Sequence, residues 1–201
     1  MKKTDIEIRE AVETDIPNLI PLVKSCFPGI VISLGPPEYT YSWWSKIIND
    51  DFAETIICIK TDGISGFCLM ITDIYRFKEF NRKVKKSIIH LVTKHPVLAL
   101  YKMKDYLLDR INNYPKASND TFASETLAWL ELLGTSPNYR RRNIAKEIIK
   151  ECIRLAKKSG KSAIKLSVRK QNITAIKLYS SLGFKKTNSS RSKYTYALTL
   201  N

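Results

Sequence analysis

The chain has 201 residues, of which 44% are hydrophobic and 10% aromatic, a composition typical of a folded domain rather than a disordered chain. This length suits a single domain spanning residues 1–201, and no apolar run approaches the roughly 20 residues needed to span a membrane. The formal net charge of +15 disfavours cationic partners and favours phosphate-bearing cofactors, nucleotides, nucleic acid or anionic lipid.

The first half of the chain predicts strands and helices in alternation. Residues 6–11 alternate in polarity as a half-buried strand does, and Thr14 or Asp15 is placed to cap a helix with Pro17 in its first turn. An aromatic-rich second helix is predicted at residues 37–49. Two strands, residues 54–60 and 64–74, flank a Thr-Asp-Gly turn and predict an antiparallel hairpin.

A basic segment at about residues 77–116 exceeds what a minimal domain needs. It predicts two short helices broken near His95-Pro96, and residues 76–116 hold eleven Lys or Arg against three Asp or Glu. Three interpretations stay open: a wall of a substrate site, a surface for dimer formation, or an amphipathic element resting on a membrane.

The cysteines and histidines do not predict a metal site. The cysteines show no CxxC spacing and lie in apolar contexts, which predicts buried, reduced thiols and a cytoplasmic protein. The N-terminus has two lysines without an apolar segment behind them, so it does not match a secretory signal. His90 and His95 have no cluster of ligands nearby. The four cysteines are Cys26, Cys58, Cys68 and Cys152.

The second half predicts a mixed α/β sheet in which neighbouring strands are locally parallel. A strand at residues 126–135 is followed by an amphipathic helix at 143–159, a buried strand at 163–168 and a helix ending at Gly183. A hairpin of residues 184–188 and 193–200 closes the chain. Strand alternation places Trp129, Glu131, Leu133 and Thr135 on one face.

A loop with three arginines joins the strand at 126–135 to its helix. Such a turn directs free backbone N–H groups and the positive end of the helix dipole at one point, and Arg140, Arg141 and Arg142 add charge there. This pattern predicts an anion site for a phosphate or pyrophosphate. The alternative is an ordinary solvated, basic helix start.

Two motifs between residues 130 and 200 resemble those of the GNAT superfamily of acetyl-CoA-dependent N-acetyltransferases. The first, P-N-Y-R-R-R-N-I-A, is similar to the family's pyrophosphate loop, and the second runs L-S-V-R-K-Q-N-I-T-A-I-K-L-Y-S-S-L-G-F. Asn143 stands where the loop usually has glycine, and asparagine tolerates the positive φ this requires. Ser167 stands where relatives that acetylate protein N-termini commonly carry glutamate.

The resemblance implies a mostly antiparallel twisted sheet with one splayed parallel strand pair, flanked by helices, with residues 77–116 inserted. It implies that acetyl-CoA lies in the splay as cosubstrate, without a metal. Tyr179 would protonate the leaving thiolate, and Glu131 is our candidate base, with an ordinary solvated carboxylate as the alternative. The residues expected to bind the cofactor are Leu132, Leu133, Gly134, Thr135, Arg140, Arg141, Arg142, Asn143, Ile144, Ala145, Asn172 and Tyr179.

The acceptor is not encoded in any motif. The positive charge favours a primary amine that itself carries phosphate, such as a nucleotide-linked amino sugar, and a protein α-amine or lysine is the alternative. A second alternative is a nucleic-acid- or membrane-binding module on an inactive scaffold of this fold. The basic segment at about residues 77–116 also contains apolar residues, so a dimer formed through it is a further prediction to test.

Overall fold

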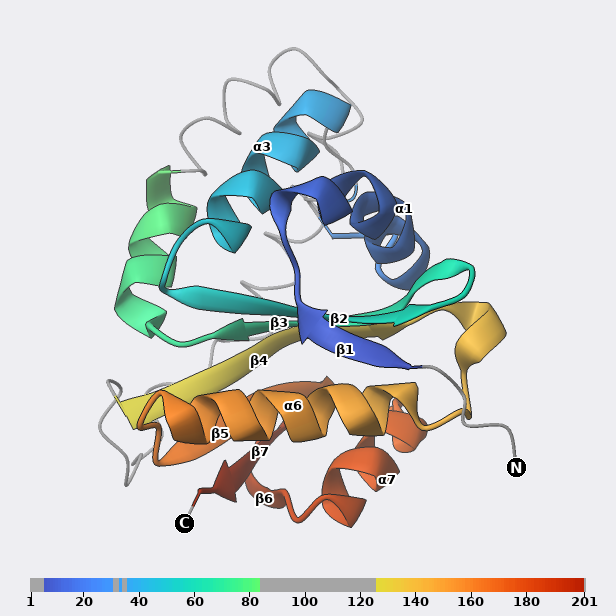
Figure 1. Ribbon diagram of the computed structural model, residues 1–201. Coiled ribbons are helices and arrows are strands. Elements are labelled where there is room, and N and C mark those ends of the chain that lie inside the picture. The colour runs from blue at the N-terminus through green and yellow to red at the C-terminus, as the bar shows by residue number, and fades with distance from the viewer. Residues whose placement is uncertain (1–5, 31–32, 34–35, 84–125, 201) are drawn as a thin grey trace.

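The computed structural model describes residues 6–30, 33, 36–83 and 126–200. The predicted helices around His95-Pro96, and both histidines, lie outside the described residues. Within them the chain forms a seven-stranded sheet in the order β1-β2-β3-β4-β5-β7-β6, and only the β4–β5 pair is parallel (Figure 1). The strands are β1 (Glu7–Glu10), β2 (Ala53–Lys60), β3 (Gly63–Ile71), β4 (Leu127–Thr135), β5 (Ala163–Arg169), β6 (Lys185–Ser189) and β7 (Lys193–Thr199).

Helices cover both faces of this sheet (Figure 1). Helices α1 (Ile16–Cys26) and α3 (Pro37–Ile48) pack with the inward residues of β2, β3 and β4 on what we call the α1 face. Helices α6 (Ile144–Lys158) and α7 (Ile173–Ser181) cover the opposite α6 face, where the core continues through β5 and β7. The predicted mixed α/β architecture is therefore confirmed.

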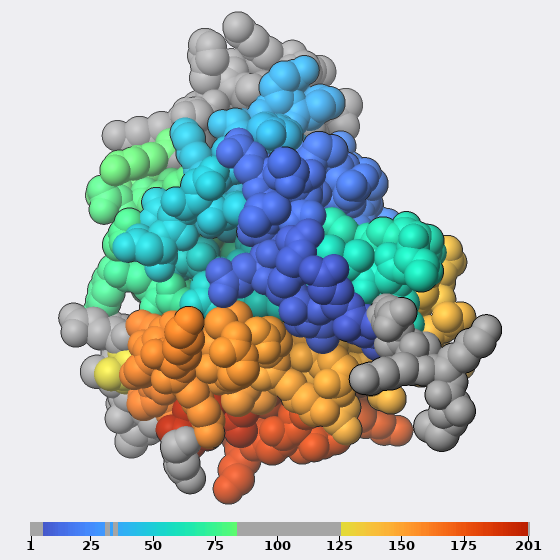
Figure 2. All heavy atoms as spheres, in the orientation of Figure 1, coloured from blue at the N-terminus to red at the C-terminus, as the bar shows by residue number. Residues whose placement is uncertain are grey.

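The hydrophobic pattern explains why α6 takes this position. Its apolar residues recur at three- and four-residue spacing, so they form one stripe that is buried against the sheet. Gly66 in β3 lets the helix approach, because a Cβ there would lie 2.7 Å from Cγ2 of Ile144 and 2.9 Å from Cδ1 of Ile148. In Figure 2 the helix, in orange, forms a band across the visible surface below the blue and cyan N-terminal half.

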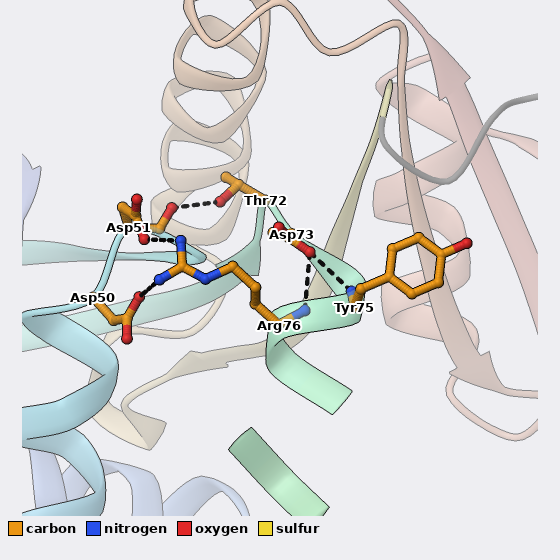
Figure 3. A network of polar contacts seen from close by, with 6 residues as sticks. All are labelled: Asp50, Asp51, Thr72, Asp73, Tyr75 and Arg76. Carbon is orange, nitrogen blue, oxygen red and sulfur yellow. Dashed lines mark hydrogen bonds and ion pairs between the residues drawn. The ribbon is translucent and has the colours of Figure 1, made fainter. Parts of the chain in front are cut away.

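Strand β3 ends earlier than the sequence pattern predicts. It stops at Ile71 instead of residue 74, and residues 74–83 are helical. Asp73 explains the break, because its Oδ1 accepts hydrogen bonds from the N–H groups of Tyr75 (2.9 Å) and Arg76 (3.0 Å) and so caps the new helix (Figure 3). The Arg76 guanidinium bonds the carboxylates of Asp50, at 2.7 Å, and Asp51. The capping by Asp73 and the ion pairs of Arg76 thus fix the position of the chain where the basic segment begins.

Strand β4 contains a β-bulge at Glu131. Its register with β3 pairs Leu69 with Leu132 and Met70 with Leu130, which leaves Glu131 without a partner. Beyond the bulge the alternation is inverted: Leu133 packs on the α6 face, whereas Trp129 packs on the α1 face. The prediction that Trp129, Glu131, Leu133 and Thr135 share one face is therefore wrong.

The thiols are mostly as predicted. All four cysteines are free, and three are buried. Cys26 is the exception, because it lies at the C-terminal end of α1, is partly exposed, and its Sγ–H donates to the carbonyl oxygen of Thr135 at 3.6 Å. The predicted burial of every thiol is wrong at this position.

Candidate active site

Strands β4 and β5 pair over only four residues and then part. The parallel register runs from Leu127–Ala163 to Leu130–Leu166, although β4 continues to Thr135 and β5 to Arg169. From residue 131 onward β4 has no ladder partner on its β5 side. Its backbone polar groups there are thus available to a ligand that lies between the strands. This is the splay that the resemblance implied.

The loop after β4 is held in a fixed path by its own backbone. Ser136 N–H donates to the carbonyl of Ser65 in β3 at 2.9 Å, and Tyr139 N–H donates to Ser136 at 2.9 Å. Two non-glycine residues then adopt positive φ, Arg141 at 62° and Asn143 at 61°. Left-handed residues within such a loop turn successive N–H groups toward one side and create an anion-binding concavity.

The positive φ at Asn143 agrees with the expectation from its side chain, which tolerates this region better than most. Arg141 was not expected to adopt it. Holding Arg141, a bulky residue, at positive φ costs on the order of 1 kcal/mol, and other contacts of the loop must offset this cost. Strain of this kind concentrates at ligand-binding loops.

A contact that the sequence does not predict ties this loop to the β2–β3 hairpin. The Tyr139 hydroxyl, at the end of η3 (Pro137–Tyr139), hydrogen-bonds the carboxylate of Asp62 in the hairpin turn. Figures 1 and 2 show the two segments side by side at the right of each view. The Arg142 guanidinium lies 5.2 Å from the centre of the Tyr139 ring, within cation–π range. Tyr139 thus fixes the path of the arginine loop.

The start of α6 completes the anion site. Asn143 is the N-cap residue, but its side chain makes no capping hydrogen bond, so Ile144, Ala145 and Lys146 present the first-turn N–H groups at the positive end of a 15-residue helix. Ile144 is buried, so only its backbone faces the loop. Arg140, Arg141 and Arg142 are all exposed. The arrangement can bind a phosphate or pyrophosphate.

Tyr179 lies on the α6 face, beneath this helix. It is buried, with its ring 5.8 Å from that of Phe184, and it lies close enough to Cys68 and Cys152 to interact electrostatically with both thiols. Cys68 pairs with Leu133 across the β3–β4 ladder, which places Tyr179 beside the parting of the strands. Burial raises the pKa of the Tyr179 phenol, so the group keeps its proton at neutral pH.

Glu131 lies at the same parting, and its carboxylate interacts with the side chain of Trp129, which packs on the α1 face. Burial raises the pKa of its carboxyl group, while the charge of Lys193 and a hydrogen bond from the Trp129 side chain act in the opposite direction. Its side chain is nevertheless exposed. Solvent therefore reaches a carboxylate whose surrounding protein atoms keep its pKa above the ordinary value. Such a group can accept a proton at neutral pH.

The structure brings most of the predicted site residues around the parting. The half-buried Leu132 and Leu133 point to opposite faces, and the buried Gly134 and half-buried Thr135 follow them. Asn172 opens α7 as its N-cap, and its Oδ1 accepts a hydrogen bond from Ala175 N–H at 3.1 Å. One lone pair of that oxygen is used by the helix, and the amide nitrogen of Asn172 can donate to a ligand.

Among residues 6–83 and 126–200, apart from the gaps at 31–32 and 34–35, no group of three or more His, Cys, Asp or Glu side chains could hold a metal ion. In the same part of the chain, no helix combines the length and apolar character that crossing a membrane requires.

Comparison with known families decides the assignment. The model of the acetyltransferase (GNAT) family matches residues 18–184, which include both motifs, the arginine loop and the two parting strands. The chain belongs to this family. The resemblance noted in the sequence is thus confirmed, together with the enzyme class, an N-acetyltransferase, and the acetyl-CoA cosubstrate that the family uses.

Solved structures of this GNAT fold superpose over nearly the whole chain. An N-acetyltransferase from Staphylococcus aureus Mu50 has a TM-score of 0.65 at 12% identity, covering 98% of this chain and 100% of its own. Arabidopsis thaliana NAA60 in complex with acetyl-CoA has 0.62 at 16%, covering 98% and 99%. The ribosomal-protein-S18-alanine N-acetyltransferase from Escherichia coli has 0.58 at 14%, covering 98% and 94%. No curated protein matches the sequence.

Proposed function

We propose that this GNAT protein transfers the acetyl group of acetyl-CoA directly to a primary amine of a small acceptor that carries phosphate, such as a nucleotide-linked amino sugar. The observation that carries the proposal is the position of Tyr179 in the core of the α6 face and of Glu131 beside Trp129, which packs on the α1 face. A thioester lying between the strands would meet a proton donor on the α6 face and a proton acceptor on the α1 face.

The cofactor would be held by its phosphates and by its pantetheine arm. The pyrophosphate would lie on the N–H groups of residues 141–145, with Arg140 and Arg142 neutralising its charge. The pantetheine amides would bond to Leu133 and Thr135 where β4 has no β5 partner, next to Gly134 and Asn172. A backbone N–H near Leu132 or Leu133 would stabilise the negative charge that develops on the acetyl oxygen.

The chemistry follows from these positions. The neutral amine attacks the carbonyl carbon, so that a C–N bond forms and the C–S bond breaks. The amine loses its extra proton to Glu131 through a water, and the CoA thiolate takes a proton from Tyr179. Burial raises the pKa of the Tyr179 phenol, so the group holds its proton until the thiolate forms beside it.

One other acceptor class and one other kind of function remain as alternatives to test. The fold is similar to that of the E. coli ribosomal-protein-S18-alanine enzyme and of NAA60, so a protein α-amine or lysine belongs in any screen. The alternative function is nucleic-acid or membrane binding on an inactive scaffold, in which the positive charge would bind phosphate groups and no acetyl group would be transferred. The four free cysteines favour a reducing, cytoplasmic setting for the enzyme.

The decisive assay measures release of free CoA thiol with acetyl-CoA and a panel of primary amines, between pH 5 and 10. We expect turnover with at least one amine and an acidic limb set by Glu131, lost as pH falls through its raised pKa. Glu131→Gln should reduce kcat by about 10²- to 10⁴-fold and remove that limb. An unchanged profile in Glu131→Gln would exclude this residue as the base.

A further inference from the structure

The α1 face of the sheet is apolar as far as strand β4 and polar at the end of β5 and the start of β7. The apolar layer beneath α1 and α3 includes Trp129 and Leu132 of β4 but no residue of β5, β6 or β7, among the residues that the structure describes. The core on the other face does continue, through Leu166 and Val168 of β5 and Tyr196 of β7. The outer half of the sheet is thus apolar on its α6 face only.

Strand alternation then determines what the α1 face of β5 and β7 presents. Between the core positions lie Ser167 and Arg169 at the end of β5 and Lys193 and Thr195 at the start of β7, whereas Ala163, Lys165 and Ala197 on the same face are buried. The antiparallel register pairs Arg169 with Lys193 and Ser167 with Thr195. The first pair and Ser167 are exposed. This polar row, which we call the β5–β7 row, lies at the end of β5 where β4 has already parted from it.

The charge of this region is one-sided. After Glu151 the remaining 50 residues contain twelve Lys or Arg and not one Asp or Glu. Glu131 directly follows Leu130, which pairs with Leu166 in the last β4–β5 pair, and its carboxylate interacts electrostatically with Lys193. The β5–β7 row therefore lies near the candidate base, on the face from which an acceptor would approach.

These cations are separate from the cofactor site. The arginine loop and the N-terminus of α6 belong to the opposite face, where the α6 core lies. A cofactor pyrophosphate bound there would not neutralise Arg169 and Lys193. Both cations are therefore available to another anion, and paired strand residues about 5 Å apart can both reach a single phosphate group.

We propose that Arg169 and Lys193 form a subsite for a phosphate group of the acceptor, with the acceptor amine held at Glu131. This assignment rests on the proposed function, because it names the substrate class of the same site. The strands of Glu131 and Lys193 have β5 between them, so their backbones are separated by on the order of 10 Å. An amino sugar phosphate spans such a distance once the long Arg and Lys side chains reach inward.

The test measures binding by calorimetry, with the protein saturated with CoA so that the arginine loop is already occupied. Matched ligand pairs are ethanolamine with phosphoethanolamine, and glucosamine with glucosamine 6-phosphate. We expect at least one phosphorylated ligand to bind about tenfold tighter or more than its partner, as charge-assisted hydrogen bonds allow. Arg169→Gln/Lys193→Gln should abolish this difference, and Arg169→Lys alone should retain part of it.

The control variant, Lys157→Gln/Lys158→Gln, removes the same charge from the exposed last turn of α6. It should keep the phosphate preference. The inference is wrong if no phosphorylated probe binds tighter than its partner, or if the preference survives in Arg169→Gln/Lys193→Gln. Salt-dependent RNA binding lost in that variant, without a small-ligand preference, would assign the row to nucleic acid instead.

Failure of the inference is distinguishable from failure of the proposed function. If the inference alone fails, the wild-type enzyme still binds CoA and still releases thiol with neutral amines, but it shows no phosphate preference that depends on Arg169 and Lys193. An inactive scaffold would instead show no thiol release with any amine, whatever the calorimetry reports. In an active enzyme, Arg169→Gln/Lys193→Gln should raise KM for the phosphorylated acceptor much more than it lowers kcat, because the subsite binds a part of the acceptor that does not react.

Discussion

Replacing Gly66 by alanine tests how closely α6 must approach the sheet. The new methyl carbon would lie 2.7 Å from Ile144 Cγ2 and 2.9 Å from Ile148 Cδ1, where carbon atoms prefer roughly 3.5–4.0 Å. Both isoleucine side chains are fully buried and cannot turn into solvent. Relieving the overlap therefore requires α6 to move by about 1 Å at its first two turns.

The expected cost follows from this overlap. Overpacking a well-packed core costs about 1–3 kcal/mol, and losing the flexibility of glycine in the unfolded chain returns about 0.4–1 kcal/mol. We expect Gly66→Ala to lower the free energy of unfolding by about 1–2 kcal/mol, and the melting temperature by roughly 2–8 °C for a protein of this size. Urea unfolding should show a lower midpoint with an unchanged slope.

The matched control is Gly29→Ala, since a Cβ at Gly29 meets nothing within 4 Å. It should leave the melting temperature unchanged or raise it slightly. Because Ile144 opens the helix whose N–H groups form the anion site, Gly66→Ala should also weaken acetyl-CoA binding, while Gly29→Ala should not. Equal stability of the two variants would refute the close-packing account of α6.

Three further perturbations address single contacts. Tyr139→Phe removes the hydrogen bond to Asp62 and should weaken acetyl-CoA binding by roughly 2- to 10-fold in calorimetry, with little change in kcat. Tyr179→Phe should lower kcat by about 10²-fold or more at an unchanged KM for acetyl-CoA, as measured by thiol release. Asp15→Asn should destabilise the protein by about 1–2 kcal/mol at pH 7, because Arg9 lowers the pKa of that carboxyl group. This difference between wild type and Asp15→Asn should shrink in melts below the ordinary pKa of 3.8, as Asp15 is protonated.

A specific result would contradict each of these three predictions. Tyr75→Phe, at an exposed tyrosine far from the loop in sequence, is the control for Tyr139→Phe, and equal affinities of the two variants would contradict the tethering role. A Tyr179→Phe enzyme with wild-type kcat would mean that the phenol does not protonate the leaving group. If the difference in stability between wild type and Asp15→Asn persists unchanged to pH 3, the negative charge of Asp15 does not stabilise the folded protein.

Local patterns predicted the elements that build the site. The periodicity of α6 and the apolar strands before and after it depend on neighbouring residues alone, and all were predicted correctly. The left-handed conformation of Asn143 also follows from its own side chain. These features need no knowledge of the rest of the fold.

Other features depend on a partner that is distant in sequence. The bulge at Glu131 exists because β3 pairs Leu69 and Met70 across it, and one sequence cannot show that register. The hydrogen bond of Tyr139 joins it to Asp62, 77 residues earlier. The end of β3 was misplaced because Asp73 caps a helix inside an apolar run that reads as strand up to Ile74. In each case tertiary contacts decided the local structure.

We propose that the arginine loop and the N-terminus of α6 hold the pyrophosphate of acetyl-CoA. Calorimetric titration of acetyl-CoA into wild type, Arg140→Ala/Arg142→Ala and Lys157→Ala/Lys158→Ala tests it directly. The two variants lose equal charge at opposite ends of a helix about 22 Å long. The account predicts binding to wild type and to the lysine variant, and affinity roughly 10- to 100-fold weaker in the arginine variant. Equal affinity in all three proteins, or no binding to any, would contradict it.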